Sequence, residues 1–179
     1  QMMLELPSAN TALAHLTLVP YIQVSEELKT KPTQHSVKEL RSLGLQPDCL
    51  ICRLGKELPN DEKKKIALFC SVDPNSVISM HDVETVYSIP LLLYTQEVDK
   101  ILLKKLNLLK VKSPRLNDWK RVVDAKLNPK KKVTIAVVGK YVDLKDSYKS
   151  LNEALDHAGI VNLAKVEIHM IDAAKITSA

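Results

Sequence analysis

The sequence predicts an α/β protein, in which a parallel sheet flanked by helices is followed by a linker and the start of a second α/β domain. Three observations support this class. Short apolar runs alternate with segments of helical period along most of the chain. The run at residues 48–53 is short and continuously apolar, as in strands buried on both faces of a parallel sheet. Hydrophobic residues make up 45% of the 179 residues, which is enough for a substantial core.

The first elements are two strands separated by a helix. Residues 15–24 favour a strand that bends at Pro20, because proline cannot donate to a strand ladder. Residues 32–43 have the period of an amphipathic helix, and Gly44 ends it. Residues 48–53 then predict the next strand.

The same alternation continues along the chain. Residues 61–70 predict a helix that acidic residues open, and residues 76–81 predict a strand. Helical segments are expected at 83–88 and 90–106, with Asp82 as a possible N-cap of the first. Strands that alternate with helices predict a parallel sheet, and ligands on such sheets bind where strands end and helices begin.

A change of pattern marks the second half. Residues 107–131 are charged and interrupted by prolines, which predicts a linker with a short helix at 116–126. A strand, a helix and a strand are then expected at 133–138, 147–157 and 165–171. One such unit cannot bury its own faces, so residues 132–179 are expected to be marginally stable alone.

Composition limits the partners. The chain has 26 basic and 21 acidic residues, a formal charge of +5, which suits nucleotide phosphates. No aromatic residues alternate with the lysines to stack bases, so nucleic acid is not an expected partner. No run is long enough to span a bilayer and no signal peptide is recognisable, so we expect no membrane association and a cytoplasmic location.

The three cysteines are expected to be reduced thiols of the core. Cys49, Cys52 and Cys70 are an odd number in apolar surroundings. Cys49 and Cys52 have C-x-x-C spacing, but in a strand side chains three apart point to opposite faces. A zinc or redox site is therefore not expected.

One segment has the composition of a polyphosphate site. Pro32 suits the first turn of a helix, and Thr30 is placed to cap it. The free N–H groups of that turn and the helix dipole would then face an anion. Two lysines and three hydroxyl or amide side chains stand at this helix mouth: Lys29, Thr30, Lys31, Thr33 and Gln34. The alternative is an ordinary capped helix with solvated lysines.

Motifs from about residue 16 onward resemble the CTP synthase family. The synthase (amidoligase) domain of that family is matched by Leu18-Val19-Pro20-Tyr21-Ile22, residues 27–41, Gln46-Pro47-Asp48, Cys52-Arg53, Lys65-Ile66-Ala67-Leu68-Phe69-Cys70, Val77-Ile78-Ser79, His81-Asp82-Val83 and Ile89-Pro90-Leu91-Leu92-Leu93. The opening of its glutaminase domain is matched by Val137-Val138-Gly139-Lys140-Tyr141 and Asp146-Ser147-Tyr148-Lys149-Ser150.

The resemblance implies a domain organisation and an activity. Residues 1–106 would be the second half of a P-loop-like amidoligase domain, residues 107–131 the interdomain linker, and residues 132–179 the truncated start of a class I glutaminase (glutamine amidotransferase) domain. The family is a ligase of pyrimidine biosynthesis that aminates UTP to CTP with ATP and Mg²⁺, using glutamine or ammonia as nitrogen donor. CTP is its feedback inhibitor, and a homotetramer is implied.

The resemblance also implies two groups of site residues. Lys65 is assigned by the motif that follows it, because spacing alone would not separate it from Lys63 and Lys64. The UTP and CTP group is Lys29, Thr30, Lys31, Pro32, Thr33, Gln34 and Lys65. The ATP group, at the adenine, is Arg53, His81, Asp82 and Val83.

Other family features are not found in this sequence. No G-x-x-x-x-G-K-[ST] phosphate loop can be drawn through its four glycines, and the family's magnesium ligands are not matched. No cysteine has the glycine-flanked setting of the glutaminase nucleophile. The chain is therefore expected to be an internal section of a CTP synthase, inactive alone and with no catalytic residue of its own. The alternative is a short non-catalytic relative that binds nucleotide and regulates assembly of the full-length enzyme.

Glu26 departs from the family pattern, which usually has glycine at this position. The change adds a Cβ and a negative charge beside the expected phosphate site. If the local backbone requires positive φ, nucleotide affinity should fall.

Overall fold

The structure is a computed structural model that describes residues 2–108 and 110–176. The chain forms two compact units, with the boundary between Pro114 and Arg115. This boundary lies within the segment 107–131. In the described residues, no helix is both long enough and apolar enough to cross a membrane.

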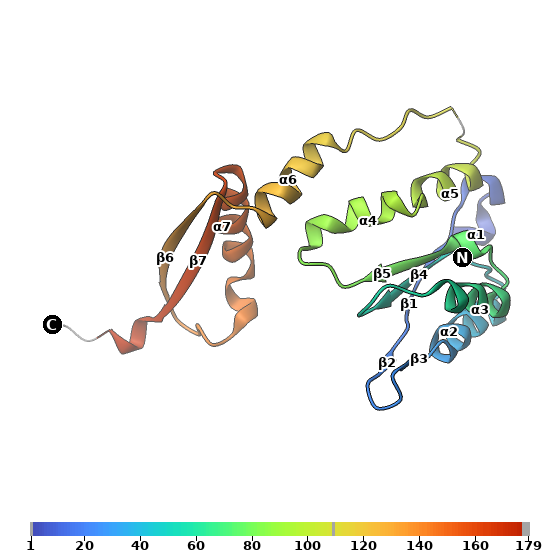
Figure 1. Cartoon of the computed structure of the whole chain (residues 1–179), viewed down its shortest axis with the longest axis horizontal. Helices are drawn as coiled ribbons and strands as arrows, with labels where there is room; N and C mark the ends of the chain where they lie inside the picture. The colour runs from blue at the N-terminus through green and yellow to red at the C-terminus, as the bar shows by residue number, and fades with distance from the viewer. Residues whose placement is uncertain (1, 109, 177–179) are drawn as a thin grey trace. The chain divides into compact units, whose positions relative to one another are not determined.

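The first unit is built on a three-stranded sheet in the order β1-β4-β5 (Figure 1). The strands are β1 (Ala14–Leu18), β4 (Cys49–Leu54) and β5 (Val77–His81). Both pairings are parallel, with Leu16 opposite Ile51 and Ile51 opposite Ile78. The predicted α/β class with a parallel sheet is confirmed, and all three carboxyl ends lie at one edge of the sheet.

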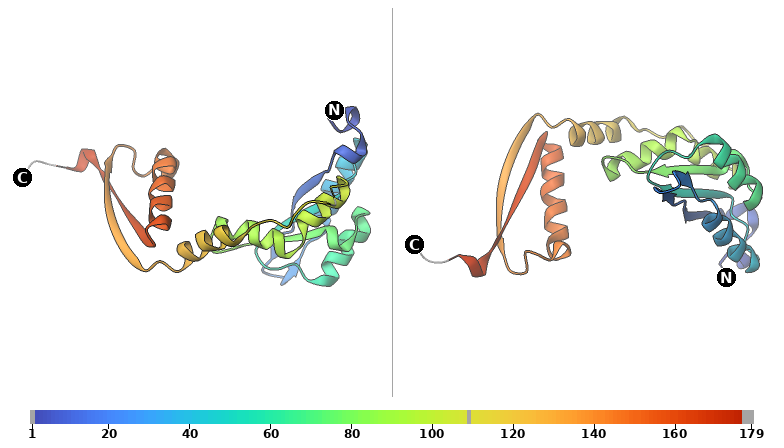
Figure 2. Two further views of the ribbon diagram at one scale, coloured as in Figure 1. Left: turned by 90° about the horizontal axis from the view of Figure 1, so that it is seen from above. Right: turned by 60° about the horizontal axis from the view of Figure 1, so that its bottom comes forward.

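Helices cover both faces of this sheet. Figures 1 and 2 show α2 (Lys31–Ser42) and α3 (Asn60–Cys70) on one side, and α4 (Ile89–Thr95) and α5 (Val98–Lys105) on the other. The core between the sheet, α2 and α3 consists of fully or almost fully buried side chains: Val19, Val37, Leu50, Cys52, Leu54, Leu58, Ile66, Ala67, Cys70 and Val77.

Local signals explain the limits of α2 and α3. Pro32 lies in the first turn of α2, where its missing N–H costs no hydrogen bond. Gly44, just after α2, has φ +79°, which glycine adopts without strain. Asp61 and Glu62 lie in the first turn of α3, where carboxylates interact favourably with the helix dipole. Both helices therefore agree with the sequence prediction to within a residue.

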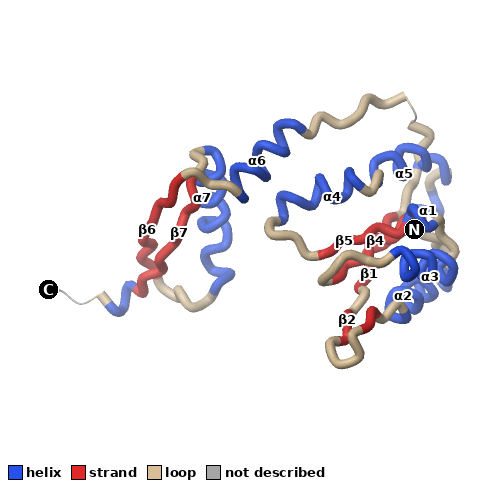
Figure 3. The backbone as a smooth tube through the Cα atoms, viewed as in Figure 1, coloured by secondary structure: helices blue, strands red, loops and turns tan. Residues whose placement is uncertain are grey.

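The predicted strand 15–24 is wrong in its second half. The chain leaves β1 after Leu18 and forms a separate antiparallel ribbon of β2 (Tyr21–Ile22) and β3 (Glu27–Leu28), which Figure 3 shows with its connecting loop. Pro20 accepts a hydrogen bond from the Lys29 N–H at 2.9 Å, and this closes the base of the ribbon.

The two helices predicted after β5 also differ. Residues 83–88 contain only a 3₁₀ turn, Val86–Ser88, and Thr85 rather than Asp82 is its cap, with the hydroxyl accepting from the Tyr87 N–H. The segment 90–106 is interrupted between α4 and α5 at Gln96 and at Glu97, whose φ is +57°. Tertiary contacts of Asp82 and Gln96, described below, account for both differences.

The second unit contains the parallel pair β6 (Lys131–Gly139) and β7 (Ala164–Asp172), with α6 (Asn117–Leu127) and α7 (Lys149–Val161). Figure 2 shows α7 along one face of the pair. A Cβ at Gly159 would lie 2.6 Å from the Ala164 carbonyl oxygen, so only glycine permits this close packing. The predicted strands and the main helix are confirmed.

Short elements complete the described chain. They are α1 (Met2–Glu5) and the 3₁₀ turns Ser8–Asn10, Pro74–Ser76, Lys145–Tyr148 and Ala173–Lys175. The prediction of reduced core thiols is confirmed, because Cys49, Cys52 and Cys70 are all free and buried.

Candidate functional site

A hollow of about 460 Å³ lies at the edge of the sheet where β1 and β4 end. Its walls come from the end of β1, from the start of the ribbon, from the end of β4 and from the residue after β5. The residues that line it include Leu18, Tyr21, Gln23, Arg53 and Asp82. Its position agrees with the rule that ligands of open parallel sheets bind outside the carboxyl ends of the strands.

Arg53 and Asp82, two of the residues predicted to bind ATP, form an ion pair at this hollow. Arg53 is in β4, and Asp82 directly follows the neighbouring strand β5. The Arg53 guanidinium also donates to the Leu54 carbonyl oxygen at 2.9 Å. About half of each side chain remains exposed, at 49% for Arg53 and 60% for Asp82, so the pair is held in place but open to a ligand.

His81 ends β5, directly before Asp82 in the chain, but does not line the hollow. Its Nδ1 is buried and has no hydrogen-bond partner among the residues that the structure describes. A buried polar atom without a partner costs free energy, but its burial keeps this nitrogen away from a ligand in the hollow. Val83 follows in the loop after β5 and is partly buried.

At the mouth of α2, hydrogen bonds hold the backbone in place. The Thr33 hydroxyl is fully buried, lies 2.8 Å from the Thr17 hydroxyl and donates to the Leu18 carbonyl oxygen at 3.2 Å. Thr30, also buried, stands at the N-cap position but makes no side-chain capping bond. Instead, its hydroxyl accepts from the Gln34 amide at 3.1 Å.

These bonds fix the first turn of α2 to the end of β1. Thr30 and Thr33 thus stabilise the helix mouth through their side chains, and a ligand would meet their backbone rather than their hydroxyls. Pro32 has no N–H, and the Gln34 N–H already donates to the Thr30 carbonyl oxygen at 3.1 Å. The Lys31 and Thr33 N–H groups remain directed toward the helix mouth, as expected for a first turn.

The lysines predicted to bind phosphate differ in their present partners. Lys29 forms an ion pair with Glu27, and Lys65 lies 3.4 Å from Glu62. Lys31 is exposed and has no ion pair within the described residues. Lys31 belongs to α2 and Lys65 to α3, two helices that pack side by side on the same face of the sheet (Figure 1).

Glu26 has φ +50°, which satisfies the condition under which we expect weaker nucleotide binding. Its backbone is left-handed in the loop that connects β2 and β3, two residues before the Leu28 that ends the ribbon. A non-glycine residue is strained in this conformation. Strain and negative charge therefore combine in the segment that leads to Lys29.

The structure joins the predicted residues into two groups. The residues at the mouth of α2 form one group, and Arg53 with Asp82 form the other. In residues 2–108 and 110–176, no hydrogen bond or ion pair links them directly. Tyr21 and Gln23, which the sequence did not single out as ligand residues, line the hollow together with the second group.

Tyr21 has a further contact that a reading of the sequence misses. The Lys56 ammonium lies 5.0 Å from the centre of its ring. Tyr21 comes from the ribbon and Lys56 from the loop after β4, so only the fold brings them together. The available sequence signal was the position of Tyr21 directly after the bend predicted at Pro20.

The described residues do not fit a metal site. Among them, no group of three or more His, Cys, Asp or Glu side chains is arranged to hold a metal ion. Two carboxylates close to the lysines predicted to bind phosphate, those of Glu27 and Glu62, are paired with Lys29 and Lys65.

The first unit matches a known protein family. A family model described as "CTP synthase N-terminus" matches residues 1–108. The match begins at residue 1, earlier than the motifs near residue 16 indicate. It covers the three-stranded sheet, the helices on both its faces and both groups of predicted site residues.

Proposed function

The chain belongs to the CTP synthase family, and from this membership we propose that its first unit binds the UTP and ATP of a ligase that aminates UTP to CTP. Membership supports a ligase of pyrimidine biosynthesis with nucleotide substrates. In the proposed reaction, ATP phosphorylates the uracil 4-oxygen of UTP and ammonia, free or from glutamine, displaces the phosphate.

The observation that carries the proposal is the pairing of Arg53 with Asp82 at the strand-end hollow. We assign this hollow to the adenine of ATP. The planar guanidinium of Arg53 can stack on a purine ring, and the half-exposed Asp82 can accept from an exocyclic amine. His81 and Val83, which flank Asp82 in the chain, belong to this assignment through the family resemblance alone.

The mouth of α2 is assigned to the triphosphate of UTP or of the inhibitor CTP. Among the described residues, Lys31 makes no ion pair, whereas Lys29 and Lys65 would exchange Glu27 and Glu62 for phosphate oxygens. The first-turn N–H groups and the helix dipole favour the same anion. Thr30, Thr33, Pro32 and Gln34 hold the turn in the required shape.

The remaining parts of the proposal rest on the resemblance. Residues 132–179 would open the glutaminase domain, which supplies ammonia, and the UTP site would be shared between subunits of a homotetramer. Mg²⁺ would accompany ATP, but since the described residues do not fit a site for it, we assign it no ligand in this chain.

Isothermal titration of the full chain with UTP, CTP and ATP tests the assignment. We expect Lys31→Ala to weaken UTP and CTP binding by about tenfold and to leave ATP binding unchanged, since a direct phosphate contact is worth roughly 1–2 kcal/mol. Arg53→Ala should weaken ATP binding and leave UTP and CTP binding unchanged. Lys38→Ala, which removes an exposed lysine from the body of α2, is the control and should leave the affinities for UTP, CTP and ATP unchanged.

Two results would overturn the proposal. The first is wild-type protein that binds none of the three nucleotides. The second is an equal loss of all three affinities in Lys31→Ala, Arg53→Ala and Lys38→Ala, which would indicate non-specific attraction between a basic chain and an anion.

A further inference from the structure

A second and larger hollow, of about 590 Å³, lies along the edge of β5 that is not paired with β4. It lies between the N-terminal half of α3 and the region where α4 gives way to α5. Its floor is apolar and includes Val77 and Ile78, each 1% exposed. None of the residues assigned above to UTP or ATP lines this hollow.

The walls of the hollow carry four lysines. Lys63 and Lys64 come from α3, while Lys100 and Lys104 lie one turn apart on α5. Lysines four residues apart project from the same face of a helix. The lining contains one acidic residue, Glu97, so its formal charge is four minus one, or +3.

Most of this positive charge is not neutralised. Lys100 pairs with Glu97 at 2.5 Å. Within the described residues, Lys63, Lys64 and Lys104 make no ion pair. Like charges around one concavity repel each other, and an anion that enters it gains from all of them at once.

One wall is held rigidly by a hydrogen-bonded clamp. The Gln96 side chain accepts from the Ser79 N–H at 2.8 Å and donates to the Ser79 carbonyl oxygen at 2.9 Å. Gln96 thereby occupies the place that a neighbouring strand would take on β5. The clamp fixes the start of α5, and with it the positions from which Lys100 and Lys104 extend.

The remaining polar lining consists of donors suited to oxyanions. Asn60 begins α3 and Asn75 lies in the turn before β5, so their amides flank the lysines. No aromatic side chain belongs to the lining of the hollow as far as the structure describes it. A ligand would therefore be recognised by negative charge and hydrogen bonding, and not by stacking of a base.

We propose that this hollow is a second anion site, which binds a compact polyphosphate. The chemistry shared by possible ligands is a chain of phosphates, either inorganic or the tail of a nucleotide. The volume is within the range of small-molecule sites, and the three lysines without an ion pair in the described residues supply part of the positive charge that a triphosphate requires. The site is separate from those of the proposed function and does not depend on them.

The test is a titration of the ¹⁵N-labelled full chain with inorganic triphosphate, followed by amide chemical shifts in NMR spectra. We expect saturable shifts at residues 60–64, 75 and 97–104. Shifts confined to residues 29–34 would overturn this proposal while supporting the UTP site. Conversely, shifts around the hollow without shifts at residues 29–34 would support this site and contradict the triphosphate site at the mouth of α2.

A pair of charge-matched variants sharpens the result. Lys63→Gln/Lys104→Gln should raise the dissociation constant at the hollow by at least about tenfold. Lys38→Gln/Lys110→Gln removes the same charge from exposed lysines elsewhere and should leave it unchanged. Equal weakening in both variants would show diffuse electrostatic attraction and overturn the site.

A comparison with ATP distinguishes the two sources of the phosphate chain. Equal affinity of the hollow for inorganic triphosphate and ATP would assign it to the phosphates alone. Tighter binding of ATP would assign it to a nucleotide. Either result supports an anion site, whereas the absence of saturable shifts around the hollow with both ligands would refute it.

Discussion

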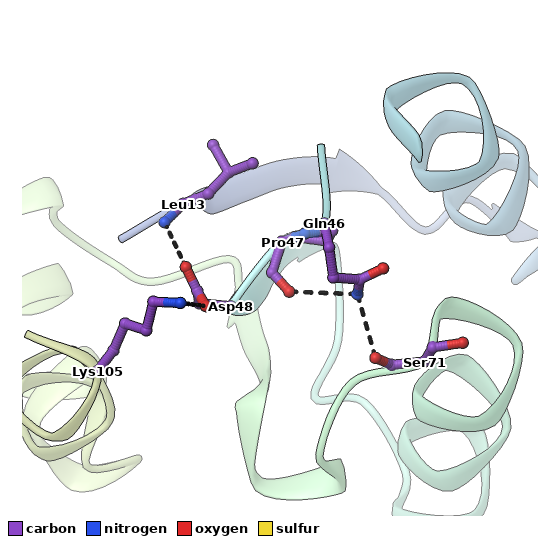
Figure 4. A network of polar contacts seen from close by, with 6 residues as sticks. All are labelled: Leu13, Gln46, Pro47, Asp48, Ser71 and Lys105. Carbon is purple, nitrogen blue, oxygen red and sulfur yellow. Dashed lines mark hydrogen bonds and ion pairs between the residues drawn. The ribbon is translucent and has the colours of Figure 1, made fainter. Parts of the chain in front are cut away.

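The ammonium of Lys105 lies 2.9 Å from the carboxylate of Asp48, which joins the last turn of α5 to the start of β4 (Figure 4). The other oxygen of Asp48 accepts from the Leu13 N–H at 2.8 Å, just before β1. One carboxylate thus holds two strands and a helix together. Gln46, two residues earlier, donates to the carbonyl oxygens of Cys70 and Ser71, at 3.2 and 3.1 Å. The family-like motif Gln46-Pro47-Asp48 is therefore structural.

Asp48→Asn should lower the free energy of unfolding by about 1–2 kcal/mol, because the pair is partly buried and hydrogen-bonded to the backbone. A double-mutant cycle with Lys105→Gln should give a coupling of about 1 kcal/mol, measured by urea unfolding followed by far-UV circular dichroism. Glu39→Gln, which neutralises an exposed side chain on α2, is the control. Its free energy of unfolding should stay within about 0.5 kcal/mol of the wild-type value. Additive effects in the cycle would contradict a direct interaction.

Glu26→Gly should stabilise the first unit by about 0.5–1 kcal/mol, since glycine adopts φ +50° without the strain of a Cβ. It should also tighten UTP binding, because it removes a negative charge near Lys29. Urea unfolding and calorimetry measure the two effects. Glu26→Ala separates them, because it removes the charge and keeps the Cβ. If the alanine variant gains as much stability as the glycine variant, backbone strain is not the cause.

The buried thiols predict a loss of stability at alkaline pH. Burial raises the pKa of Cys52 from 9.0 to about 11, and the pKa values of Cys49 and Cys70 are also raised by burial. The folded state favours the neutral thiol. The resulting contribution to the free energy of unfolding is fully present below pH 9 and is lost as pH rises toward 11. For Cys52 the loss is roughly 2–3 kcal/mol.

Thermal unfolding at pH 8 and pH 10.5 measures this dependence. The fall in Tm between the two values should be smaller in Cys52→Ala than in wild type. Val37→Ala removes an equally buried side chain that does not titrate, so its fall should match wild type. An identical fall in all three proteins would exclude Cys52 as the source.

The second unit should unfold before the first. Its buried hydrophobic residues within the described chain are Val123, Ala125 and Ala164, each 8% exposed, whereas the first unit has many at 0–3%. Val133 and Val138 in β6 are 41% and 55% exposed, as expected for a two-stranded sheet that lacks neighbours.

The single tryptophan makes this prediction easy to test. Trp119 lies in α6, so its fluorescence reports on the second unit. Its transition in urea should occur at a lower concentration than the transition seen by far-UV circular dichroism. Coincident transitions would mean that the two units unfold cooperatively and that the second unit is not marginal.

Sequence reasoning worked where local signals agreed with the fold. The helices α2 and α3 were predicted to within a residue, because the apolar period agrees with Pro32 and Gly44 at the ends of α2 and with the acidic first turn of α3. It failed at 83–88, where the carboxylate of Asp82 bonds Arg53 instead of capping a helix. It failed again within 90–106, where Gln96 leaves the helical path to clamp Ser79.

The sequence by itself determined the class of fold, the order of the strands and helices other than the ribbon and the segment 83–106, and membership of the CTP synthase family, because these depend on local periodicity and on motifs of adjacent residues. Only the tertiary structure decided which polar groups come together. Arg53 meets Asp82, and Lys63 lines a hollow with Lys104, although each pair is far apart in the chain. The physical reason is that parallel strands require long crossovers, so the residues at a shared sheet edge are brought together by register and packing.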